Sequence, residues 1–126
     1  MIKGTQLNTT SAVDNPERVF TASTDGTPIG GAVVGVQQAI TTMIACNTSA
    51  VDITDETSGE ATINVYLVKS GNTADVDNII VSNLTIPAGE TVFFSDEKII
   101  LDAGDQIWFG CDVTGTITVT VSSLPV

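Results

Sequence analysis

The chain has 126 residues, of which 42% are hydrophobic, and its 15 acidic residues against 4 basic ones give a net charge of −11. This length and composition predict one folded domain. The charge disfavours nucleic acid and anionic membranes as partners, because both would repel it. The sequence has no histidine, which excludes Ser-His and Cys-His catalysis, so we expect neither an enzyme nor a cofactor site.

Residues 1–16 are polar, and we expect them to form an extended N-terminal arm or a loosely docked edge segment. Residues 17–126 are expected to form the folded domain. Within them, short apolar or alternating runs predict about eight strands and no helix. These runs are residues 17–22, 38–47, 62–69, 79–86, 91–94, 97–101, 106–111 and 116–122. Strands at this spacing are typical of an all-β fold, an antiparallel β-sandwich of jelly-roll type.

Two turn motifs of the same design separate the later strands. The first runs from Pro87 through Gly89 to Glu90, and the second ends in Gly104 and Asp105. Proline near the start of a turn and glycine near its end are typical of type II geometry. We therefore expect positive φ at both glycines, and capping of the turn backbone by Glu90 or Asp105.

Acidic residues in loops are the candidates for chemistry in this sequence. Asp75, Asp77 and Asn78 place three oxygen donors within four residues, which makes them candidate calcium ligands. The sequence lacks the full EF-hand spacing and its bidentate glutamate. The alternative is that these are solvated loop residues that keep the surface soluble.

Two aromatic doublets, Phe93-Phe94 and Trp108-Phe109, lie in expected strands. Neighbouring strand residues point to opposite faces, so one member of each doublet faces the core and the other faces a second sheet, a partner or solvent. The strand that contains Met43 is apolar or small on both faces. We take these five residues as candidate interface residues and expect a homo-oligomer.

Cys46 and Cys111 both lie in apolar strand-like runs. They are either two buried small apolar residues or, if their strands are neighbours, a disulfide. The sequence leaves this open.

Several short motifs follow one another in a fixed order from residue 46 onward. They are Cys46-Asn-Thr, Val65-Tyr-Leu-Val with Ser70-Gly71, Ala74-Asp75, Asn78, Ala88-Gly-Glu-Thr and Leu101-Asp-Ala-Gly-Asp. In this order they resemble a family of small virion proteins of tailed bacteriophages, common in phages of cyanobacteria and other marine hosts. The resemblance covers about residues 40–126. Similar Ala-Gly-acid turns occur in cupins, but a cupin would need metal-binding histidines.

The resemblance implies a structural protein of the virion. The family motifs consist of residues that form turns, and no catalytic residues carry over from them. The expected role is a capsid decoration or cement subunit. It would bind the major capsid protein or other virion proteins through apolar patches and residues 1–16. One alternative is a module of the tail, collar, baseplate or fibre. Another is a sugar-binding or cupin-like domain, which the absence of histidine disfavours.

Overall fold

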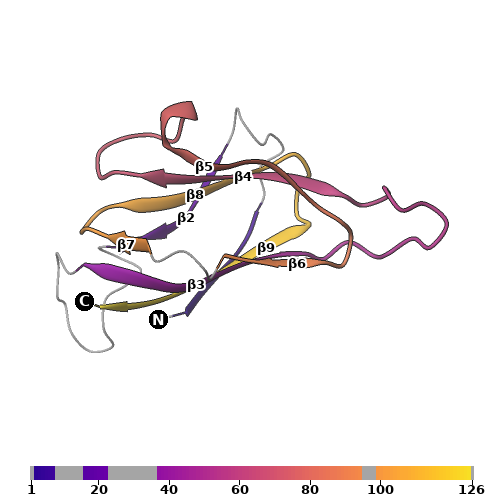
Figure 1. The fold of residues 1–126 in the computed structure, drawn as a ribbon, viewed down its shortest axis with the longest axis horizontal. Helices are drawn as coiled ribbons and strands as arrows, with labels where there is room; N and C mark the ends of the chain where they lie inside the picture. Colours follow the sequence, from indigo (N-terminus) through magenta and orange to yellow (C-terminus); the bar gives the residue numbers. More distant parts are fainter. Residues whose placement is uncertain (1, 8–15, 23–36, 95–98, 126) are drawn as a thin grey trace.

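The computed structural model describes residues 2–7, 16–22, 37–94 and 99–125, and these ranges consist mainly of β-strands joined by turns. Two antiparallel sheets pack together, so the expected β-sandwich is confirmed (Figure 1). The strands are β1 (Ile2–Gln6), β2 (Glu17–Thr21), β3 (Gln38–Asn47), β4 (Ala61–Val68), β5 (Ile79–Ile86), β6 (Thr91–Phe93), β7 (Ile99–Leu101), β8 (Gln106–Cys111) and β9 (Ile117–Pro125). One turn of 3-10 helix, η1 (Val76–Asn78), precedes β5.

The strand order is that of a jelly roll. Sheet A has the order β1-β9-β3, with β6 and β7 both paired to the free side of β3, and sheet B has the order β2-β8-β4-β5. β6 pairs with one end of β3 and β7 with the other, so the two act as halves of one strand position. Along the chain the eight positions change sheet at every connection except that between β4 and β5, which pair within sheet B, and this is the order of two Greek keys.

The core lies between the sheets and is filled from alternate positions of the strands. The fully buried members with the largest side chains include Phe20, Met43, Ile63, Ile107 and Phe109. Burying a side chain of this size stabilises the fold by about 1.5–3 kcal/mol relative to leaving it exposed. The described residues therefore build one continuous core, which 126 residues are long enough to support.

Of the two expectations for the N-terminal segment, its described residues 2–7 fit a docked edge segment. Residues 2–6 form β1, an edge strand in continuous register with β9, from Ile2 opposite Ser122 to Gln6 opposite Thr118. Leu7 is completely buried, and its N–H donates to the carbonyl oxygen of Ile117 at 2.8 Å. Backbone pairing and one apolar anchor are enough to hold a polar edge strand. The described part of residues 1–16 thus belongs to the sandwich, and residues 8–15 lie outside the described ranges.

β5 departs from simple alternation. Asn83 has a φ of 56°, and the pairing register with β4 shifts beside it. Its N–H donates to the side-chain oxygen of the buried Asn64 at 2.7 Å, which fixes this irregularity. As a result Ile80, which simple alternation would place on the same face as Leu84 and Ile86, is 47% exposed.

Candidate functional site

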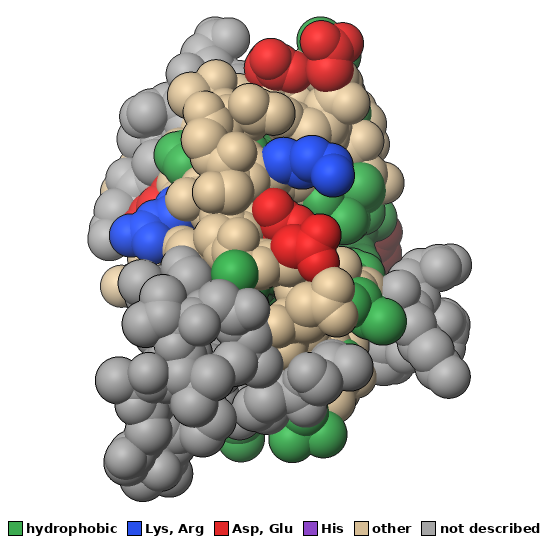
Figure 2. All heavy atoms as spheres, turned by 90° about the vertical axis from the view of Figure 1, so that its left-hand side faces the viewer, with side chains coloured by type: hydrophobic (Ala, Val, Ile, Leu, Met, Phe, Trp, Pro, Cys, Tyr) green, Lys and Arg blue, Asp and Glu red, His purple; other side chains and the backbone are tan. Residues whose placement is uncertain are grey.

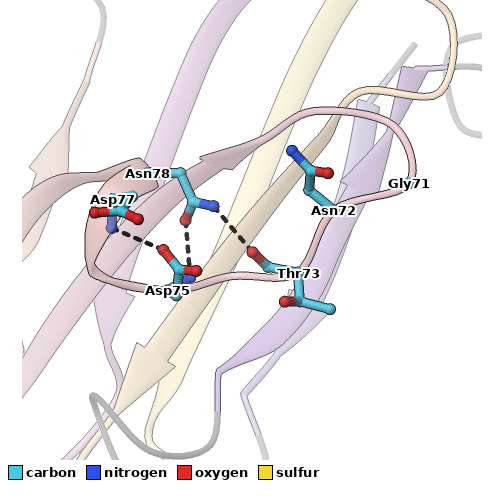
Figure 3. A pocket seen from close by; sticks show the side chains of 6 residues that line it. All are labelled: Gly71, Asn72, Thr73, Asp75, Asp77 and Asn78. Carbon is cyan, nitrogen blue, oxygen red and sulfur yellow. Dashed lines mark hydrogen bonds between the residues drawn. The ribbon is translucent and has the colours of Figure 1, made fainter.

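The calcium candidates lie in the connection between β4 and β5, where the side chains of Asp75 and Asn78 cap η1 (Figure 3). The Asp75 carboxylate accepts from the N–H of Asp77 at 2.7 Å, and the Asn78 side-chain oxygen accepts from the N–H of Asp75 at 3.0 Å. The Asn78 amide also donates to the carbonyl oxygen of Thr73 at 2.9 Å. This reciprocal pattern is a capping box. One oxygen of each of these two side chains is therefore already used by the backbone of its own turn.

The expected turn geometry is present at both motifs. Gly89 and Gly104 have φ values of 76° and 88°, and each turn is closed by a hydrogen bond from its fourth residue to the carbonyl of its first. The Asp105 carboxylate accepts from the N–H of Asp102 at 3.1 Å and from the N–H of Ser70 at 3.0 Å. It thereby joins two neighbouring connections as well as capping its own turn.

The candidate interface residues divide between the core and the surface. Met43 and Phe109 are completely buried, which corrects their assignment to an interface. Phe94 is half-buried and packs edge-on against Phe109, with ring centroids 6.3 Å apart. Trp108 is half-buried on the other side of sheet B, and its indole N–H donates to Gln106. Phe93 alone of the five is largely exposed, at 63%.

Acidic side chains are concentrated at the two ends of the sandwich. Among the described residues, every Asp and Glu except Glu17 lies in a connection between strands. One end carries Asp102 and Asp105, which line a hollow of about 260 Å³ together with Lys69. Figure 2 shows this end, with acidic side chains gathered around a basic one. The sheet faces between the two ends are correspondingly poor in charge.

Among the residues that the structure describes, those on the outer face of sheet A are all uncharged. These residues alternate along the strands with core residues such as Val119 and Val121, and the pairing register places them in rows. They are Ile2, Gly4, Gln6, Ala39, Thr42, Ile44, Cys46, Thr91, Phe93, Ile100, Thr118, Thr120, Ser122 and Leu124. The one charged residue in the strands of sheet A is Lys3, which pairs with Val121 and so shares the inward-facing register.

Large apolar side chains stand at the margins of this uncharged face. Phe93 on β6, Ile100 on β7 and Leu124 on β9 are 63%, 60% and 58% exposed, and Ile2 on β1 is 74% exposed. The centre is made mainly of smaller residues such as Thr42 and Thr120, with the half-buried Ile44 among them. The aromatic doublet identified Phe93 from sequence, but the rest of the face depends on strand register, which the sequence does not show.

The acidic connection of residues 48–60 projects from the sandwich, at the right of Figure 1. Ile53 near its tip is 93% exposed and Val51 is 67% exposed. The Asp52 carboxylate accepts from both the N–H and the hydroxyl of Thr54, at 2.9 and 2.7 Å. These hydrogen bonds hold the pKa of the Asp52 carboxyl below its ordinary value, the hydroxyl having the largest effect.

The two cysteines are both free, with Cys46 on sheet A and Cys111 on sheet B. Cys111 is completely buried, and burial raises the pKa of its thiol. The structure therefore answers the question left by the sequence in favour of two separate thiols.

In comparisons with known proteins, neither a protein-family model nor a curated protein matches this chain. Within the described ranges, no helix has the length and apolar character needed to cross a membrane. In the same ranges, no group of three or more Cys, Asp or Glu side chains is arranged to hold a metal ion.

Proposed function

We propose that this chain is a structural subunit of a bacteriophage virion, and most specifically a decoration or cement protein of the capsid. The ordered set of motifs from Cys46 to Asp105 carries the proposal. Each motif lies in a strand or in a turn that holds two strands together. Motifs of this kind stabilise a fold, and the family that they resemble has a structural role in the virion.

The strand order supports the same role. Jelly rolls serve as domains of viral capsids, as well as in lectins and cupins. Fold alone does not give function, and a cupin would use histidines, of which this chain has none. The jelly roll is therefore the architecture expected of the family that the motifs resemble.

The connections at both ends are held by side-chain hydrogen bonds to the backbone. Asp105 joins two turns at one end, and Asp112 accepts from the N–H of Thr62 at 2.8 Å at the other. Such contacts raise the free energy of local opening. A virion protein must stay folded outside a cell, and resistance to local unfolding is consistent with that requirement.

The test is quantitative mass spectrometry of virus particles purified from the source on a density gradient. The proposal predicts that the chain co-purifies with particles at a copy number comparable to that of the major capsid protein. A copy number far below that of the major capsid protein would assign the chain to the tail or collar. Absence from intact particles would overturn the virion role.

A further inference from the structure

We propose that the outer face of sheet A is a self-association surface, at which two copies of this chain pack sheet against sheet. This inference is independent of the virion role and concerns the purified chain itself. It rests on where charge is absent, on the size of the face and on the distribution of large and small residues across it.

The distribution of charge on this chain favours a second copy as the partner that binds the face. Two chains of net charge −11 repel each other, and the described acids lie at the ends of the sandwich, except Glu17 on β2 of the other sheet. The outer face of sheet A is where the copies can meet without bringing acidic side chains together. A basic partner would gain no electrostatic attraction from an uncharged face, and would bind more favourably at the acidic ends.

The face is large enough for a stable contact. It is four strands wide, and β9, with nine residues, runs along it. With strands about 4.8 Å apart and a rise of about 3.4 Å per residue, the face covers roughly 600 Å². Two copies would then bury about 1,200 Å², at the lower end of the range for specific interfaces.

The distribution of side-chain size makes the face complementary to itself. One row of the register runs from Gly4 on β1 through Thr120 and Ile44 to Phe93 on β6. A two-fold axis parallel to the strands places β1 of one copy over β6 and β7 of the other. Phe93 then lies above Gly4 of the second copy, where a Cβ would meet nothing within 4 Å in the free chain. Aligned packing of this kind is one of the two common arrangements of stacked sheets.

The experiment is sedimentation equilibrium of the full chain over a concentration series, at low and at high salt. Wild type is expected to form a dimer whose affinity increases with salt, because salt screens the repulsion between two acidic copies. Phe93→Glu is expected to weaken dimerisation at least tenfold. Ile53→Glu, which makes the same change in charge at an exposed apolar residue away from the face, is expected to leave the affinity within about threefold of wild type.

Phe93→Lys separates the effect of the face from the effect of net charge. It makes the chain less acidic, so a contact governed by net charge would tighten, whereas a contact that buries Phe93 weakens. Circular dichroism and thermal unfolding check that each variant is folded. Leu124→Glu provides a second substitution on the face, at another exposed side chain.

Tighter association of Phe93→Lys would overturn the proposal, and so would three further results. The first is a chain that stays monomeric at every concentration and salt. The second is a dimer that Phe93→Glu and Ile53→Glu weaken equally, since the contact would then lie elsewhere. The third is a dimer that dissociates as salt rises, which would indicate attraction between charged groups.

Discussion

The side-chain amide of Asn47 donates a hydrogen bond to the carbonyl oxygen of Ile86 at 2.9 Å, across 39 positions of the chain. The same amide donates to the carbonyl of Gly59 at 2.8 Å, and its oxygen accepts from the N–H of Ser49 at 3.0 Å. The backbone N–H of Asn47 also donates to the carbonyl oxygen of Glu90 at 2.9 Å. One completely buried residue therefore joins the end of β3 to two connections and to the end of β5.

Asn47→Ala is expected to lower the free energy of unfolding by about 2–4 kcal/mol, because it leaves buried backbone groups without their partners. Chemical denaturation measures this directly. Asn72→Ala is the matched control, since Asn72 is exposed and its side chain makes no hydrogen bond within the described ranges. The control is expected to change stability by less than about 0.5 kcal/mol. Equal losses in the two variants would contradict the role given to Asn47.

Gly104→Ala and Gly71→Ala separate backbone strain from steric contact. Both glycines have positive φ, 88° and 85°, so each substitution costs about 1–2 kcal/mol through conformation alone. A Cβ at Gly104 would lie 2.6 Å from the Ser70 hydroxyl oxygen, whereas one at Gly71 would meet nothing within 4 Å. Thermal unfolding should therefore show the larger loss for Gly104→Ala. A loss of stability no greater than that of Gly71→Ala would show that Ser70 and the turn move aside for the Cβ at no cost in free energy.

Gln38→Met is expected to stabilise the fold by about 1 kcal/mol. Gln38 is 1% exposed, and within the described ranges neither polar atom of its side chain has a hydrogen-bond partner. Methionine keeps the shape and removes the desolvation penalty of the buried amide. Gln106→Met is the contrasting variant, because the Gln106 oxygen accepts from the indole N–H of Trp108 at 2.7 Å. Differential scanning calorimetry should show a higher Tm for the first and a lower Tm for the second.

The pKa of Asp52 gives a prediction about pH. Because the pKa of Asp52 is lower in the folded than in the unfolded chain, its contribution to stability is fully present above the unfolded value and is lost as pH falls through the folded one. Thr54→Ala removes the hydroxyl that is the main cause, so the pKa of Asp52 should rise toward its ordinary value. An NMR titration of the Asp52 carboxyl in both proteins measures the change. Identical titrations would contradict this cause.

Sequence periodicity was sufficient for most of the strands. β3, β5 and β8 begin and end at the expected residues, since their apolar runs are bounded by turn residues. The sequence left β1 open between an extended arm and a docked edge segment, because its five residues contain one apolar side chain and owe their place to backbone pairing with β9. The single turn η1 was missed, although Asp75 followed three residues later by Asn78 is a capping pattern that could have indicated it.

The candidate surface was harder to predict than the fold. The aromatic doublets correctly placed one member of each pair outside the core, but Phe93 becomes part of a surface only through its register with Ile44 and Thr120. That register joins residues from distant parts of the sequence. The role of Asn47 was invisible for the same reason, because its carbonyl partners belong to residues 59 and 86.

The most direct test of the virion role is cryo-electron microscopy of particles purified from the source, with this jelly roll fitted into the map. The proposal predicts density that fits the chain at repeated, symmetry-related positions over the outer surface of the shell. A map whose outer surface is accounted for by other proteins, with no density that fits this sandwich, would contradict the assignment to the capsid.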